Sequence, residues 1–397
     1  MQKDRDNAFS PFTLNGLTLK NRFIKTATFE GMSKDGIPTP DLFRFHREIA
    51  EGGVAMTTVA YGAVNEDGLT NEDQMVINEN AMPYLEKLAK EVHDAGGAIS
   101  LQLTHCGFFT RSTRYKSRRP QAPSRILNKY GIMKGRSFSK AMNQDDLDRT
   151  RADFGKAAQL AKTCGFDAVE VHLGHGYLLS QFLTPIFNKR KDHYGGNLEN
   201  RLRYPLEVVR EVRKNVGESF PIICKMNLCD GFEGGLTEEE AIKVAKALEK
   251  EGMDALLLSG GVTSRTPFYL MRGEVPLKEM VRAEKNILQK LALFLFGKQI
   301  IRKYDFEPNF FLEQAKKVRA EVEIPLIYVG GVISGWYIGR IMASGFDLIA
   351  LGRALIHDPR FLEKVKEAGL YKSECNQCNV CVAEMDRSGV QCVLQEK

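Results

Sequence analysis

Eight short runs of apolar, often β-branched residues recur along the chain and are typical of buried strands. They lie at residues 22–28, 54–60, 98–103, 167–172, 221–227, 254–260, 325–331 and 347–352. Between them fall stretches with apolar residues three and four positions apart, which predict amphipathic helices at 81–97, 147–165, 198–217, 237–252 and 311–322. The chain therefore alternates between predicted strands and predicted helices.

An alternation of this kind predicts parallel strands joined by right-handed helical crossovers. An open doubly wound sheet and a closed eight-stranded barrel both satisfy it, and the count of eight favours the barrel. No predicted strand runs directly into a G-x-G-x-x-G helix start, which argues against a Rossmann dinucleotide site. We predict an α/β fold, a (β/α)8 TIM barrel that occupies residues 1–370 and carries loop insertions.

Two stretches, at about 104–144 and about 263–308, are too long for plain loops, and we expect both to be insertions at the barrel mouth. The second contains ILQKLALFLFGKQIIRKY at 287–304, an apolar stretch with lysines and arginines at intervals. It predicts a helix that covers the barrel mouth or packs on a partner subunit. A helix that lies on a membrane surface is the alternative.

The 397 residues carry a formal net charge of +6, which is spread thinly apart from one basic run, RYKSRRP at 114–120. We interpret that run as a solvated or anion-attracting loop rather than a nucleic-acid patch. The first residues lack the apolar core of a signal peptide, and no stretch is apolar enough to span a membrane. We therefore expect a cytoplasmic protein with no transmembrane segment and no nucleic-acid partner.

Four of the eight cysteines crowd the C-terminal end, and we treat residues 371–397 as a separate Cys-rich segment: Cys375, Cys378, Cys381 and Cys392. Without an export signal, this crowding indicates metal ligation rather than disulfides. Three closely spaced cysteines and one distant one can hold a [4Fe–4S] cluster. Zinc on four thiolates and reduced thiols without a metal are the alternatives.

Polar residues follow the predicted strands at their carboxyl ends, where a TIM barrel places its chemistry. They are Thr26, Thr28, Tyr61, Gln102, His172, His175, Tyr177, Lys225 and Asn227. Two neighbouring imidazoles can bind and polarise one carbonyl or phenolate oxygen, and a tyrosine can deliver a proton. A structural role for the histidines is the alternative, whereas the H-x-x-H pair lacks the acidic third ligand of a zinc site.

Glycine-rich turns, YVGGVISG and ALGRALI, follow the seventh and eighth predicted strands. Glycine lets a ligand approach the backbone N–H groups, and Arg353 can hold a phosphate through two hydrogen bonds. Gly331, Gly352 and Arg353 therefore predict a phosphate site at this corner of the barrel. A flavin anchored there would place its pyrimidine edge near Gln102 and its negative charge, when reduced, near Lys225.

Four segments together resemble the Old Yellow Enzyme family of NADH:flavin oxidoreductases, in order over roughly residues 8 to 370. They are PFTLNGLTLKNRFIKTAT, LQLTHCG, VHLGHGYLLSQFLTPIFNKRKDHYGGNLENRLR and VGGV with GFDLIALGRALIHDP. The resemblance implies a TIM barrel that binds FMN, which NADH or NADPH reduces and which then passes a hydride to the β-carbon of an activated alkene. It also implies that His172 and His175 bind the substrate carbonyl and that Tyr177 protonates the α-carbon. The FMN contacts that it implies are Thr26, Gln102, Gly331, Gly352 and Arg353.

The chain departs from that family at several positions. Lys225 stands where members usually have Arg, which keeps the charge but loses the bidentate fork. Phe29 stands where Cys or Thr often tunes the flavin. Tyr61, a candidate substrate contact, resembles an aromatic residue of the trimethylamine dehydrogenase branch. That branch and the 2,4-dienoyl-CoA reductases carry a [4Fe–4S] cluster after the barrel and continue into nucleotide-binding domains that these 397 residues do not contain.

We therefore expect an FMN-dependent ene-reductase that acts on small α,β-unsaturated carbonyl compounds. An iron–sulfur flavoprotein of the dienoyl-CoA reductase or amine dehydrogenase type is the alternative. A metal- or nucleic-acid-binding protein on a degenerate barrel is a third reading, which the intact set of strand-end residues argues against. Assembly into a homo-oligomer and the choice between NADH and NADPH stay open at this stage.

Overall fold

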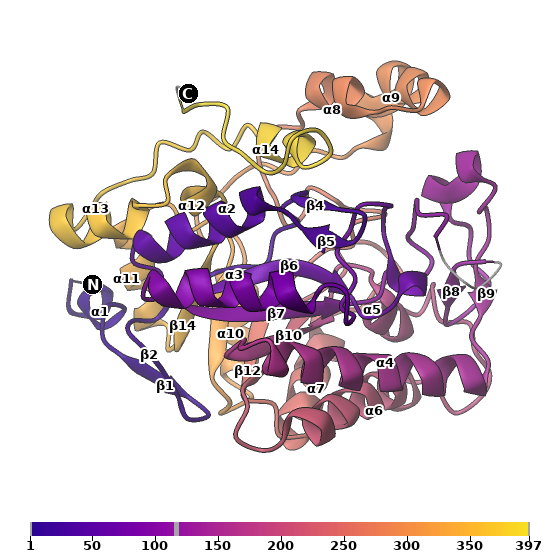
Figure 1. The fold of residues 1–397 in the computed structure, drawn as a ribbon, viewed down its shortest axis with the longest axis horizontal. Coiled ribbons are helices and arrows are strands. Elements are labelled where there is room, and N and C mark those ends of the chain that lie inside the picture. The colour runs from indigo at the N-terminus through magenta and orange to yellow at the C-terminus, as the bar shows by residue number, and fades with distance from the viewer. Residues whose placement is uncertain (1, 115–118, 396–397) are drawn as a thin grey trace.

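A closed barrel of parallel strands forms the centre of the computed structural model, which describes residues 2–114 and 119–395 (Figure 1). Its strands are β3 (Phe23–Lys25), β6 (Met56–Ala63), β7 (Ala98–Thr104), β10 (Ala168–Leu173), β11 (Ile222–Asn227), β12 (Ala255–Ser259), β13 (Leu326–Val329) and β14 (Leu348–Leu351). The last strand pairs with the first, with Ile349 opposite Phe23, and this pairing closes the barrel. The predicted TIM barrel and its eight strands are confirmed.

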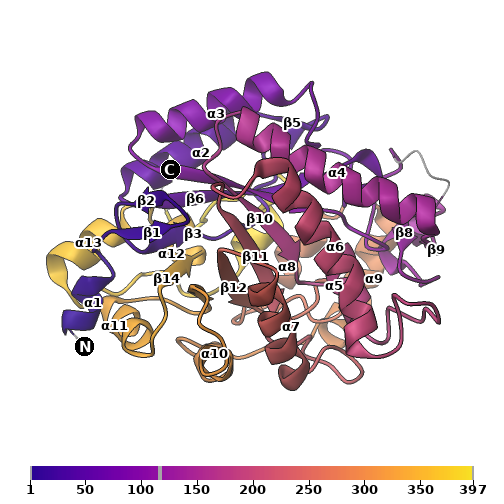
Figure 2. The same cartoon turned by 90° about the horizontal axis from the view of Figure 1, so that it is seen from below.

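Helices surround the barrel and bury one apolar face each against it (Figure 2). The larger ones are α2 (Pro40–Glu51), α3 (Met82–Asp94), α4 (Gln144–Thr163), α6 (Leu198–Val216), α7 (Glu238–Lys250), α10 (Leu312–Arg319), α11 (Gly335–Ala343) and α13 (Phe361–Ala368). In α7, for example, Ala241, Val244, Ala245 and Leu248 are buried at helical spacing, and the Thr237 hydroxyl caps the first turn. All five predicted amphipathic helices are present. None of the helices described is long and apolar enough to cross a membrane.

The barrel interior changes character along its axis. A layer that includes Ile24, Met56, Ile223 and Leu257 fills the end where the strands begin, and the hairpin of β1 (Phe12–Leu14) and β2 (Leu17–Leu19) closes that end. Ala168 of β10 belongs to this layer. Because side chains in a strand alternate between faces, Glu170 and His172, two and four positions after Ala168, point into the same interior. The interior therefore becomes polar toward the carboxyl ends of the strands.

Smaller elements shape the mouth of the barrel. Between β7 and α4 lie β8 (Gln121–Ala122), η2 (Lys129–Lys134) and β9 (Lys140–Ala141), and between β12 and α10 lie α8 (Leu277–Ala283) and α9 (Ile287–Ile300). Further short elements of the chain are α1 (Gln2–Asn7), β4 (Ser33–Lys34), β5 (Ile37–Pro38), η1 (Glu66–Gly68), α5 (Leu178–Leu183), α12 (Arg353–His357) and α14 (Val380–Glu384). The helix predicted at 287–304 is present as α9 and projects with α8 from the body of the molecule (Figure 1). The basic run at 114–120 falls mostly outside the described residues.

The Cys-rich segment packs on the barrel. The backbone N–H of Val390 donates to the carbonyl of Glu30 at 2.6 Å. A Cβ on Gly31 would overlap the carbonyl oxygen of Met385, so this close contact requires glycine. The side chain of Asn379 donates to the carbonyls of Met271 and Glu274 at 2.7 and 2.9 Å. The segment therefore forms part of one wall of the barrel mouth.

Candidate active site

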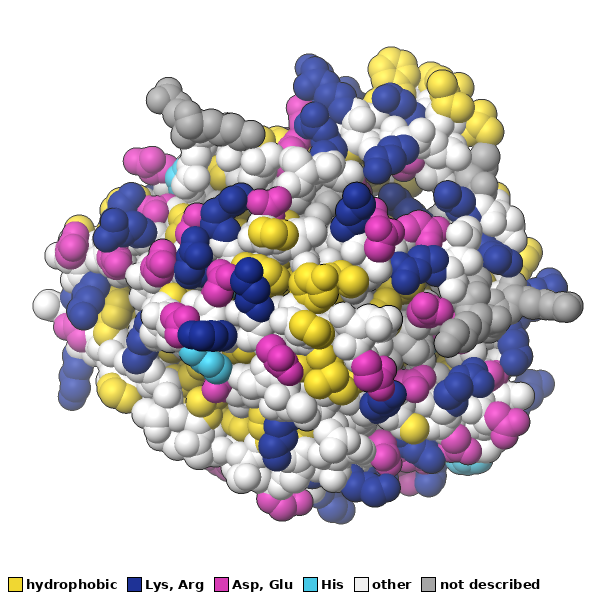
Figure 3. Space-filling model, in the orientation of Figure 1, with side chains coloured by type: hydrophobic (Ala, Val, Ile, Leu, Met, Phe, Trp, Pro, Cys, Tyr) yellow, Lys and Arg dark blue, Asp and Glu magenta, His cyan; other side chains and the backbone are white. Residues whose placement is uncertain are grey.

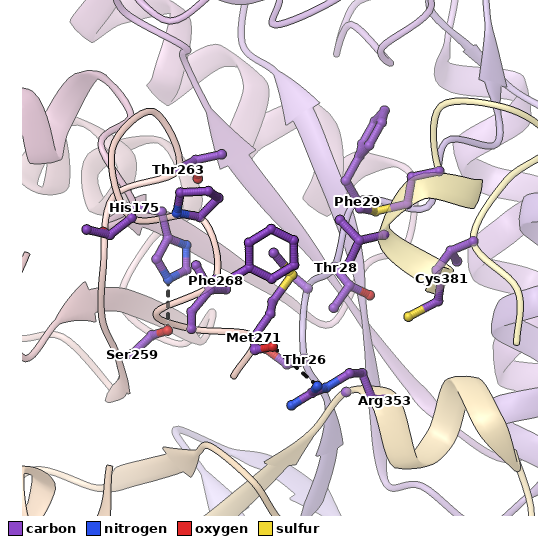
Figure 4. Close-up of a pocket in the computed structure, with 18 of the residues that line it drawn as sticks. Thr26, Thr28, Phe29, His175, Ser259, Thr263, Phe268, Met271, Arg353 and Cys381 are labelled. Atoms are coloured by element: carbon purple, nitrogen blue, oxygen red, sulfur yellow. Dashed lines mark hydrogen bonds between the residues drawn. The ribbon is translucent and has the colours of Figure 1, made fainter. Parts of the chain in front are cut away.

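A cavity of about 940 Å³ opens at the carboxyl ends of the barrel strands. This volume lies at the upper end of the range for small-molecule and cofactor sites. Every predicted cofactor or substrate contact lines it: Thr26, Tyr61, Gln102, His172, His175, Tyr177, Lys225, Gly331, Gly352 and Arg353. Two of the four clustered cysteines, Cys375 and Cys381, line it as well. Figure 4 shows Arg353 and Cys381 on one side of the cavity and His175 with Ser259 on the other.

Glu170 organises the floor of the cavity. It is almost fully buried and accepts a hydrogen bond from Gln102 Nε2 at 2.5 Å, while Lys225 Nζ lies 3.8 Å from the same oxygen, Oε1. Lys225 also donates to Thr26 Oγ1 and to the carbonyl of Ala27, both at 3.1 Å. Burial lowers the pKa of Lys225, and the Glu170 charge opposes that shift. Gln102 donates one of its two amide N–H groups to Glu170, so its second N–H and its amide oxygen are left to bond a ligand.

A second buried ion pair, Lys25 with Glu30, lies on the outer face of the barrel wall, against Phe45 and His46 of α2. Lys25 Nζ donates to Glu30 Oε1, and His46 Nε2 lies 3.5 Å from that oxygen. Burial lowers the pKa of Lys25, with Glu30 the main opposing charge, and it lowers the pKa of His46 as well. We did not anticipate Lys25, Glu30 or Glu170 from the sequence. Glu170 stands two positions before His172 in the same strand, and this period of two is the signal that could have identified it.

His172 and His175 form one hydrogen-bonded chain. The chain runs from Thr104 Oγ1 to His172 Nδ1 (3.4 Å), from His172 Nε2 to His175 Nδ1 (3.0 Å), and from His175 Nε2 to Ser259 Oγ (2.8 Å). Burial is the main cause that lowers the pKa of His172 well below its usual value and that of His175 to about 3. Both rings are therefore neutral near pH 7, and each has one N–H donor and one acceptor.

The backbone at His175 is held in an unusual conformation. Its φ is +59°, in the left-handed region that costs energy for a residue with a side chain. The Asn227 side chain accepts from the His175 N–H at 3.0 Å and donates to the carbonyl of Gly261 at 2.8 Å. Asn227 thus fixes the loop that directs His175 toward the cavity.

Tyr177 lies over His172, with ring centroids 4.5 Å apart, and its ring contacts Tyr61 edge-on at 5.3 Å. Burial raises the pKa of Tyr61 to about 12 and raises that of Tyr177 well above its usual value. The neighbouring Tyr61 raises the pKa of Tyr177 further. Tyr177 therefore keeps its O–H proton at neutral pH. The structure brings all four predicted rings, Tyr61, His172, His175 and Tyr177, to one wall of the cavity.

The opposite end of the cavity is formed by the turns after β13 and β14. A Cβ on Gly331 would lie 2.9 Å from the backbone at Glu307 and Asn309, so the chain needs glycine at this position of positive φ. Arg353 Nη1 donates to the carbonyl of Arg272 at 2.8 Å and to Asn379 Oδ1 at 2.7 Å. Among the described residues its other guanidinium nitrogens have no hydrogen-bond partner, so they can reach a ligand.

The cavity fits a phosphate-bearing flavin such as FMN. Its volume suffices, and the glycine turns and Arg353 lie at one end while Gln102 and Lys225 lie on the floor. Thr28 Oγ1 and Ser264 Oγ line it as buried hydroxyls without a hydrogen-bond partner among the described residues. Such groups are costly to bury unless a ligand supplies their partners.

The four clustered cysteines are free thiols beside the Arg353 end of the cavity. Burial raises the pKa of Cys381 to about 12, and Cys392 Sγ lies 3.3 Å from His357 Nδ1. Within residues 2–114 and 119–395, no group of three or more His, Cys, Asp or Glu side chains is placed to hold a single metal ion. Zinc on four thiolates would need sulfur atoms within about 4 Å of one another.

Comparison with known proteins identifies a matching family and a related sequence of similar length. The sequence profile of the NADH:flavin oxidoreductase / NADH oxidase family matches residues 7–265. The chain is 38% identical to a 4,4'-dithiodibutanoate disulfide reductase of Rhodococcus erythropolis, over 98% of this chain and 95% of that one.

Solved structures share the fold. A 2-naphthoyl-CoA reductase in complex with 2-naphthoyl-CoA superposes with a TM-score of 0.79 and 23% identity, over 97% of this chain but only 58% of that one. A morphinone reductase in complex with tetrahydroNAD superposes with a TM-score of 0.71 and 24% identity, over 94% of each chain. At this level of identity the two structures support the barrel fold alone.

Proposed function

This chain belongs to the NADH:flavin oxidoreductase / NADH oxidase family and is an NAD(P)H-linked flavin oxidoreductase, and we propose that it is an FMN-dependent ene-reductase. The observation that carries the proposal is the wall of His172, His175 and Tyr177, which faces the cavity opposite the phosphate corner. Its substrates are small α,β-unsaturated carbonyl compounds, and NADH or NADPH is the electron source.

The chain's own residues would hold FMN at positions already described. Thr26, Gln102 and Lys225 would contact the ring system, and Gly331, Gly352 and Arg353 would contact the phosphate. Bound FMN supplies the hydride, which it receives from NAD(P)H. Burial lowers the pKa of Lys225, and the opposing charge of Glu170 favours its protonated form on the cavity floor.

The histidine pair binds and polarises the substrate carbonyl. Because both rings are neutral, they donate hydrogen bonds without giving up a proton. The carbonyl oxygen accepts from His172 Nε2 and His175 Nδ1, which bond each other when no substrate is bound. Thr104 and Ser259 keep the other two ring nitrogens oriented. Tyr177 then donates its retained phenolic proton to the α-carbon.

Replacing Tyr177 by Phe tests this assignment. The variant should keep NAD(P)H-driven flavin reduction and lose about 10²-fold or more in the enone half-reaction, because general acids contribute about 10²–10⁴-fold. Stopped-flow absorbance separates the two half-reactions. Phe replaces Tyr at the same volume, so the packing on His172 and Tyr61 is preserved. An enone half-reaction at the wild-type rate would exclude Tyr177 as the proton donor.

A disulfide is the competing electron acceptor, because the relative at 38% identity is a disulfide reductase. Turnover of cyclohexenone and of 4,4'-dithiodibutanoate should therefore be measured side by side. Preference for the enone supports the proposal. Turnover of the disulfide alone would replace it.

The second candidate is an iron–sulfur flavoprotein, favoured by the position of the cysteines. Cys375 and Cys381 line the same cavity as the proposed flavin contacts, on a segment that packs against the barrel. Four thiols are the donor set of a [4Fe–4S] cluster, which is larger than a single ion and spreads its ligands further apart. Anaerobically purified protein should contain about four irons per chain, and Cys381→Ser should lower that content. Protein without iron and acid-labile sulfide would exclude the cluster.

A further inference from the structure

The helix α9 carries its apolar side chains outward. Ile287, Phe294 and Ile300 are 80%, 69% and 70% exposed, and Leu288, Leu291, Leu295 and Phe296 are each more than half exposed. The residue that α9 buries is Gly297, where a Cβ would collide with Leu277 of α8. A helix of a globular protein normally buries its apolar side chains and exposes its polar ones. In α9 the apolar side chains point to several sides of the helix, and most of them are exposed.

Positive charge surrounds the apolar face. Residues 277–303 contain seven lysines and arginines and two glutamates. Lys290 and Lys298 lie on α9 itself, are exposed, and form no ion pair with another described residue. Figure 3 shows the hydrophobic side chains gathered over α9 at the top right, next to a group of Lys and Arg.

We propose that the α8–α9 hairpin docks on an anionic membrane surface, with the apolar face of α9 in the interface and the surrounding cations on the lipid headgroups. Apolar side chains flanked by Lys and Arg are the features that such interfacial helices share. Each cation near an anionic lipid surface adds to the binding. Met280, Glu284, Gln289 and Leu293 of the same hairpin segment also line the cavity, so a docked membrane would lie beside the proposed active site.

The observations favour a membrane over a second copy of the chain. In a two-fold dimer through α9, the lysines and arginines of one hairpin would face those of the other, whereas anionic headgroups would pair with them.

Vesicle flotation of the purified full chain tests the proposal. The protein should bind vesicles of phosphatidylcholine with roughly one-third phosphatidylglycerol much more tightly than vesicles of phosphatidylcholine alone. The double variant Leu291→Gln/Phe294→Gln should lose at least about tenfold in partitioning, because each position buries an apolar side chain in the interface. Lys290→Gln/Lys298→Gln should lose about fivefold per lysine on anionic vesicles only.

Leu370→Gln is the matched control, because Leu370 is 67% exposed but lies outside the hairpin. It should bind vesicles like the wild type. All substituted side chains are exposed, and circular dichroism confirms that each variant is folded. Absence of binding to both kinds of vesicle would overturn the proposal. So would a wild-type dimer, seen by analytical ultracentrifugation, that Leu291→Gln/Phe294→Gln converts to a monomer without any vesicle binding by either protein.

Discussion

Glu170→Gln is the substitution that tests the organisation of the cavity floor most sharply. Glutamine preserves the size of the side chain and can still accept a hydrogen bond from Gln102, so the change removes only the negative charge. Lys225 Nζ lies 3.8 Å from Glu170 Oε1, and both groups are almost fully buried. At an effective dielectric constant of about 20, two unit charges at that separation attract by about 4 kcal/mol.

The free energy of unfolding should therefore fall by about 3–5 kcal/mol in Glu170→Gln, the usual cost of removing one partner of a buried ion pair. Lys225→Met should cost a comparable amount, because it leaves Glu170 buried without its cation. The double variant removes both charges, so its loss should be well below the sum of the two. The double-mutant cycle should yield a coupling of about 3 kcal/mol or more.

Urea unfolding followed by circular dichroism measures all four proteins of the cycle. The exposed pair Lys246 and Glu321 is the control, because both side chains are about half exposed and such pairs couple by about 1 kcal/mol or less. A coupling between Glu170 and Lys225 as small as that of the control pair would refute the assignment of Glu170 as the counter-ion of Lys225.

Buried side chains in and around the cavity give three further predictions. His105 is buried directly after β7, and folding lowers its pKa to about 4 and that of His175 to about 3, both from 6.5. The unfolded chain therefore binds protons that the folded one does not as pH falls below 6.5. Urea unfolding at pH 7.5 and pH 5.5 should show each histidine removing about 1.4 kcal/mol of stability at the lower pH, and equal stability at both would contradict the burial argument. Ser259→Ala removes the hydroxyl that bonds His175 Nε2 and should cost about 1–3 kcal/mol in the same assay, whereas no loss would mean that the ring finds another partner. Arg353→Lys should weaken FMN binding about tenfold or more in a fluorescence titration, because lysine loses the guanidinium fork; unchanged affinity would remove Arg353 from the phosphate site.

The barrel and much of its site could be predicted because both have local signals. Strands of a parallel barrel are buried on both faces, so they appear as continuous apolar runs such as residues 254–260. Their carboxyl ends converge on one mouth, which is why His172, Lys225 and Arg353 could be assigned to a common cavity from their positions after strands.

The buried charges could not be predicted with the same ease. Lys25 and Glu170 stand inside apolar runs, and only their partners, Glu30 and Lys225, explain how they are accommodated. Those partners are brought together by the closed barrel, since Glu170 and Lys225 belong to adjacent strands.

Long-range packing also decided the place of the Cys-rich segment and of α9. Nothing near Asn379 in the sequence indicates that it bonds Met271 and Arg353, so residues 371–397 were predicted only as a separate Cys-rich segment and not as a wall of the cavity. The apolar pattern of 287–304 predicted a helix correctly, but the side that the helix turns to its neighbours depends on α8.

We propose that this chain reduces activated alkenes through a flavin bound at the barrel mouth. The most direct test is the absorbance spectrum of the purified protein, recorded without oxygen before and after NADH or NADPH and then after cyclohexenone. We expect visible flavin absorbance that the nicotinamide cofactor bleaches and cyclohexenone restores. A flavin that bleaches but is not restored would contradict the ene-reductase assignment, and a protein that stays colourless when FMN is supplied would contradict the site itself.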